Sequence, residues 1–126
     1  MKDDYVSFEV AKLLKEKGFN EYCLKNYWSS DKELHDWKWE LSYNRNSDGN
    51  RNTKDCAAPT HQMAMKWLRE EYGIFIEISA LKRYRWVYTI YKLFEEKITE
   101  VWNDGTYVSY EDAVEAALKY SLENLI

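Results

Sequence analysis

The sequence has few of the residues that interrupt helices and strands, and few of those that form metal or nucleophilic sites. Its 126 residues include one proline, four glycines, two cysteines and two histidines. The four glycines stand alone, which excludes glycine-rich phosphate loops of the Walker and Rossmann kinds. Two cysteines are too few for a disulfide-stabilised scaffold, so we expect Cys23 and Cys56 to be reduced thiols.

Long apolar runs are also missing. No aliphatic or aromatic run exceeds three residues, as in residues 74–76, whereas a helix needs roughly 20 apolar residues to cross a bilayer. The first ten residues, MKDDYVSFEV, carry two aspartates and no apolar stretch, a pattern unlike a signal peptide. These features predict a cytoplasmic protein without membrane contact.

Apolar and aromatic side chains are nevertheless abundant. The composition is 45% hydrophobic and 17% aromatic, with six tryptophans and eleven tyrosines. A chain of this length is expected to form one domain with one modest core, here residues 1–126. So many large rings exceed what a small core readily hides, and Trp and Tyr are favoured interface residues.

Three segments have helical periodicity and recognisable ends. They are SFEVAKLLKEKGF, THQMAMKWLREEYGI and SYEDAVEAALKYSLENLI. Ser7 and Ser109 are expected N-caps, and Gly18 and Gly73 are expected to end the first two helices in the left-handed conformation.

Strand patterns lie between the helices. They cover residues 22–28, 37–43, 74–80, 86–94 and 97–102. The order α-β-β-α-β-β-β-α predicts a single α+β domain with an antiparallel sheet covered by about three helices. Residues 44–59, rich in Asn and Asp, have no pattern of either kind and are expected to form a flexible loop.

The few His and Cys residues do not form a convincing reactive site. Cys56 and His61 are close in sequence, but the spacing of the two cysteines and two histidines matches no zinc motif. We expect His61 to lie solvated in the first turn of its helix and Cys56 to precede that helix in the loop. Acidic pairs such as Glu95 and Glu96 are typical of solvated helix ends and turns. The sequence therefore predicts no enzyme, no metal and no cofactor.

Charge is distributed unevenly along the chain. The net charge is −4, yet residues 81–94 hold four basic residues and no acid, whereas residues 95–126 hold eight acids and two bases. The basic segment interleaves cations with rings, as proteins that bind single-stranded nucleic acid do. The candidate binding residues are Lys82, Arg83, Tyr84, Arg85 and Trp86. An acidic chain and a strand with alternating core aromatics argue against this interpretation.

A family resemblance is evident in three motifs taken together, which are YVSFEVAKLLKEKGF, APTHQMAMKWLRE and YEDAVEAALKYSLENLI. The chain resembles a family of short uncharacterised proteins from gut Bacteroidales genomes and their phages or mobile elements. The resemblance implies a small accessory protein and gives no catalytic, cofactor or binding residue.

The leading hypothesis is a non-enzymatic accessory protein that acts through protein contacts, with a two-fold homodimer as its simplest form. The alternative is a nucleic-acid-binding module that uses residues 82–91. A further idea, that the acidic segment 95–126 mimics nucleic acid, depends on charge alone.

Overall fold

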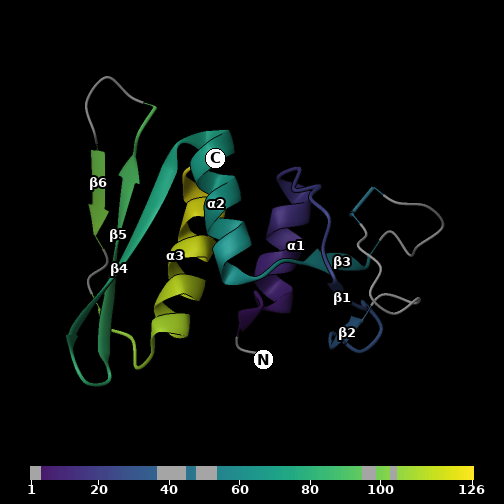
Figure 1. The fold of residues 1–126 in the computed structure, drawn as a ribbon, viewed down its shortest axis with the longest axis horizontal. Helices are drawn as coiled ribbons and strands as arrows, with labels where there is room; N and C mark the ends of the chain where they lie inside the picture. The colour runs from purple at the N-terminus through teal and green to yellow at the C-terminus, as the bar shows by residue number, and fades with distance from the viewer. Residues whose placement is uncertain (1–3, 37–44, 48–53, 95–98, 103–104) are drawn as a thin grey trace. The chain divides into compact units, whose positions relative to one another are not determined.

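The computed structural model describes residues 4–36, 45–47, 54–94, 99–102 and 105–126 (Figure 1). The elements in chain order are α1 (Phe8–Glu16), β1 (Lys25–Tyr27), β2 (Leu34–Asp36), β3 (Cys56–Ala58), α2 (His61–Tyr72), β4 (Ile74–Lys82), β5 (Arg85–Lys92), β6 (Thr99–Trp102) and α3 (Tyr110–Asn124). The predicted α+β class with three helices is confirmed. Contacts group the chain into two compact units, residues 1–60 and 61–126, and the single-domain organisation stays a prediction.

Helix α1 of the first unit begins and ends where the sequence indicates. The Ser7 hydroxyl accepts a hydrogen bond from the Val10 amide at 3.2 Å, which satisfies one of the donors left open at a helix start. At the other end Gly18 has φ +94°, and the Phe19 amide donates to the Leu14 carbonyl at 2.9 Å. Both predicted caps are therefore confirmed.

The sheet of the first unit has the antiparallel order β2-β1-β3. The sequence correctly indicates a strand within residues 22–28, but its expected partner, 37–43, lies outside the described residues. Strand β1 pairs instead with Leu34–Asp36, in the segment expected to connect two strands, and with Cys56–Ala58.

The expectation that Cys56–Ala58 belongs to a loop is wrong. These small residues are fully buried and contact α1 (Figure 1), where a larger side chain would hold the helix away. Nearby, the Asn46 carboxamide accepts from the Ala57 amide and donates to the Phe19 carbonyl, both at 2.8 Å. Residues 44 and 48–53 of the expected flexible loop lie outside the described residues.

The sheet of the second unit is the antiparallel meander β4-β5-β6, as its three predicted strands indicate. Helices α2 and α3 pack against β4 and β5 on one side of this sheet (Figure 1). Ile76 and Ile90 are directly opposite each other and buried, so this face holds the core of the unit. Phe75 and Tyr91, the next pair, stack with ring centroids 6.0 Å apart on the opposite face.

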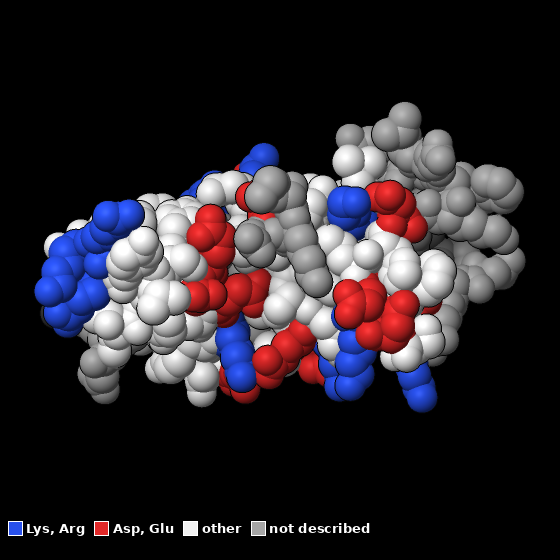
Figure 2. All heavy atoms as spheres, turned by 90° about the horizontal axis from the view of Figure 1, so that it is seen from below, with Lys and Arg blue, Asp and Glu red and all other residues white. Residues whose placement is uncertain are grey.

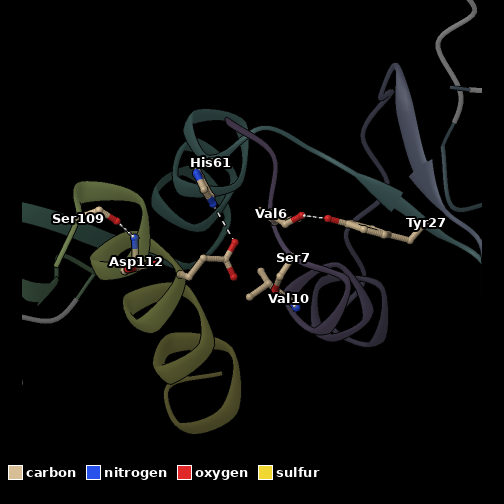
Figure 3. Close-up of polar contacts among 8 residues, drawn as sticks. Val6, Ser7, Val10, Tyr27, His61, Ser109 and Asp112 are labelled. Atoms are coloured by element: carbon tan, nitrogen blue, oxygen red, sulfur yellow. Dashed lines mark hydrogen bonds and ion pairs between the residues drawn. The ribbon is translucent and has the colours of Figure 1, made fainter. Parts of the chain in front are cut away.

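In the second unit, the start of α3 and the end of α2 are also as predicted. Ser109 accepts from the Asp112 amide at 3.1 Å at the start of α3 (Figure 3). Gly73 follows α2 with φ +64°. In the parts of the chain that the structure describes, no helix combines the length and the apolarity needed to cross a bilayer.

Candidate binding hairpin

The five candidate residues lie where β4 turns into β5. Lys82 and Arg85 are paired across the hairpin, and Arg83 and Tyr84 form the turn between them. The sequence separates strand 74–80 from strand 86–94 and places the five residues at the start of the second strand without indicating a turn, because the segment has no Gly, Asn or Pro. The structure brings four of them together at the tip, which we define as Leu81–Arg85.

Tyr84 has an unusual backbone conformation for its residue type. Its φ is +62°, in the left-handed region that Gly and Asn occupy readily and that a bulky side chain enters at a cost of about 1–2 kcal/mol. The side chain is 64% exposed, so burial of the ring does not offset this cost. Strain at an exposed residue is a physical reason to look for a function of that residue.

The basic residues of the tip are exposed and surrounded by few acids. No Asp or Glu occurs in residues 78–94, and among the described residues no carboxylate pairs with Lys82, Arg83 or Arg85. The Arg83 guanidinium lies 5.1 Å from the centroid of the Tyr84 ring, within cation–π range. Figure 2 shows a group of basic side chains at the left of the view, where this hairpin ends.

Leu81 adds an apolar side chain to the tip. The register of the hairpin shifts between Ala80 and Lys82, so Leu81 has no partner residue on β5. It is 60% exposed. A bulge of this kind redirects side chains at a strand end. The sequence gives no signal for it, because no residue type specific to bulges occurs there.

Trp86, the fifth candidate, is held in the fold. It is half-buried, exchanges two backbone hydrogen bonds of 2.8 Å with Tyr107, and contacts the Tyr110 ring edge-on. Tyr88 and Ile90, on the same face of β5, are buried. The alternating aromatics are thus core residues, and Tyr84 does not extend their face.

The histidine that the sequence singled out is not solvated. His61 is 5% exposed, and its Nε2 lies 2.8 Å from Oε1 of Glu115 on α3 (Figure 3). The expectation of a solvated first-turn residue is wrong because α3 packs beside α2. No group of three or more His, Cys, Asp or Glu residues within the described ranges is placed to hold a metal ion.

The comparisons with known proteins give no relative. No family model matches the chain, and neither a curated protein nor a solved structure is significantly similar to it.

Proposed function

We propose that the protein is a non-enzymatic accessory protein, without a cofactor, that docks on an acidic protein surface through the tip. The strained and exposed Tyr84 carries this proposal. Its neighbours are two arginines, a lysine and Leu81, and Tyr and Arg are, together with Trp, enriched among the residues that dominate binding energy at interfaces. The setting we propose is the cytoplasm of a bacterium that carries a phage or mobile element.

A second copy of this chain is the first partner to test. Residues 95–126 hold eight acids and two bases, so the sequence of a second copy supplies an acidic segment opposite in charge to the tip. Two copies related by a two-fold axis would make the same contact twice. Attraction between exposed charges weakens as salt increases, because screening shortens the range of the interaction.

Light scattering at low and high salt tests whether the protein forms this dimer. The unmodified protein should have the mass of a dimer at low salt and approach that of a monomer at about 1 M salt, where the Debye length is about 3 Å. The double variant Arg83→Ala/Arg85→Ala and the variant Tyr84→Ala should be monomeric at low salt. Lys66→Ala is the matched control, because it removes one charge from an exposed part of α2 away from the tip.

A strict monomer at every salt concentration would overturn the dimer. Affinity capture from lysate then tests another protein partner, with the unmodified chain and the double variant as parallel baits. If both baits capture the same proteins in the same amounts, docking through the tip is wrong.

Nucleic acid is the second candidate, because the tip combines an acid-free cationic cluster with an exposed ring. The observations favour it less: Trp86 and Tyr88 pack inward, which leaves Tyr84 as the one exposed ring of the five candidates for base stacking. Fluorescence anisotropy with labelled single-stranded DNA and RNA tests it. Binding that falls steeply with salt and is lost in Arg83→Ala/Arg85→Ala would establish this function in place of protein docking.

A further inference from the structure

A cavity of about 660 Å³, open to solvent, lies in the first unit, on the side of α1 that faces the β1–β2 connection and the start of β3. Its volume is in the range of sites that bind small organic molecules. The residues that matter for its chemistry are Phe8, Lys12, Lys15, Glu16, Lys32 and Lys54. Those from α1 follow a spacing of three or four residues, which places them on one face of the helix.

The cavity is strongly cationic. Four lysines and one glutamate line it, although the chain as a whole carries a net charge of −4. Like charges held together repel one another, and a bound anion removes this repulsion. Lys15 is fixed at the wall, because its Nζ donates to the Asp55 carbonyl at 2.7 Å.

Lys32 enters this lining from a strained backbone. Its φ is +58°, and with Tyr84 it is one of two non-glycine residues with positive φ among the described residues. Its amide donates to the Trp28 carbonyl at 2.8 Å, which holds the turn in place. A glycine would adopt this conformation without strain, so the lysine side chain is the feature that needs an explanation.

The cavity also offers a ring. Phe8 is half-buried and lies edge-on to Tyr27, with ring centroids 5.8 Å apart. The Lys32 ammonium is 5.9 Å from the Phe8 centroid, so a cationic and an aromatic side chain face the same space. A ligand with an anionic group and a flat apolar group would match both.

We propose that this cavity binds a phosphorylated small molecule of nucleotide size. The lysines would receive the phosphate groups, for which ammonium groups are common protein partners, and the Phe8 ring would contact the flat part. This site is separate from the tip and does not depend on the function proposed for it.

Isothermal titration calorimetry with ADP, inorganic pyrophosphate and adenosine tests the proposal. ADP should bind at low salt, pyrophosphate should bind more weakly because it lacks the ring, and adenosine should give no signal. Binding of pyrophosphate with the affinity of ADP would show that the lysines alone attract anions, and would overturn the role of Phe8. No binding of ADP or pyrophosphate at millimolar concentration would overturn the site.

The variant Lys32→Gly separates binding from folding. It removes the side chain and relaxes the backbone, so thermal stability should be kept or raised while ADP affinity falls about tenfold, the effect of losing one charge-assisted hydrogen bond. Lys12→Gln should act in the same direction. Lys66→Gln, and the tip variant Arg83→Ala/Arg85→Ala, should leave ADP affinity unchanged. If Lys32→Gly and Lys12→Gln bind ADP as the unmodified protein does, the cavity is not the site.

Discussion

The imidazole of His61 and the carboxylate of Glu115 form a hydrogen bond of 2.8 Å that joins the first residue of α2 to the middle of α3. The His61 side chain is 6% exposed and that of Glu115 is 27% exposed. The bond therefore provides a buried polar ring with a partner where water has little access.

Replacing the carboxylate of Glu115 tests how much this hydrogen bond contributes to stability. Glu115→Ala leaves the buried ring without this partner, so the free energy of unfolding should fall by about 1–3 kcal/mol. Glu115→Gln keeps a polar group with an oxygen and a donor at the same position on the side chain, so its free energy of unfolding should fall much less. Urea unfolding of the three proteins measures both changes. Equal losses in the two variants would show that the negative charge, and not the hydrogen bond, is what matters.

The contact between Gly73 and Phe94 predicts a coupled effect. A Cβ atom at Gly73 would overlap the Phe94 ring, in addition to the cost of a side chain at φ +64°. Gly73→Ala should therefore destabilise the protein by more than about 1 kcal/mol, and Phe94→Ala should relieve part of that loss.

Gly18 is the matched control for this cycle. It also has positive φ, +94°, but a Cβ there would meet no atom within 4 Å. Gly18→Ala should cost stability through the backbone alone, and Phe94→Ala should not change that cost. Unfolding curves that give additive effects for Gly73→Ala and Phe94→Ala would contradict the predicted overlap.

Cys23 predicts a loss of stability at alkaline pH. Burial, with a smaller contribution from the negative charge of Glu21, raises the pKa of the Cys23 thiol from 9.0 to about 12. The unfolded chain loses this proton near pH 9 and the folded chain keeps it until about pH 12, so the thiol's contribution to stability is complete below pH 9 and decreases above it.

Cys23→Ala isolates this effect from the other groups that titrate at high pH. The difference in free energy of unfolding between the unmodified protein and the variant should be constant up to about pH 9 and should then shift in favour of the variant. Urea unfolding from pH 7 to pH 11 measures it. A difference that does not change with pH would show that the thiol titrates alike in both states.

The buried hydrogen bond of Tyr27 predicts a loss of stability when its hydroxyl is removed. Its hydroxyl donates to the Val6 carbonyl at 2.6 Å, and the ring is 5% exposed (Figure 3). Tyr27→Phe should reduce the free energy of unfolding by about 1 kcal/mol, the typical net value of a buried hydrogen bond. Tyr120→Phe, on the outer side of α3, is the control and should be neutral. Thermal melts of both variants give the comparison.

The sequence predicts the parts of the fold that depend on neighbouring residues. Helix periodicity, the Ser7 and Ser109 caps and the glycine ends involve groups at most a few positions apart, so the local pattern contains both partners. The strands of the β4-β5-β6 meander are also long enough to show their own pattern.

The remaining features depend on residues far apart in the chain. Strand β3 has only three residues and forms by pairing with β1, which lies some 30 positions away in the sequence. His61 is buried by a helix whose Glu115 is 54 positions distant. The lysines of the cavity come from three separate segments, so no single stretch of sequence indicates the site. The turn at Tyr84 was missed because a strained tyrosine takes the place of the usual turn residue.

The exposed tip also has a consequence for proteolysis. Trypsin cleaves after lysine and arginine, and Lys82, Arg83 and Arg85 offer three such bonds within four exposed residues. A cut there falls between two strands that are paired from Ile74 to Ala80 of β4, so the two fragments should remain associated. The rate of cleavage within the tip is thus a label-free measure of whether the tip is covered.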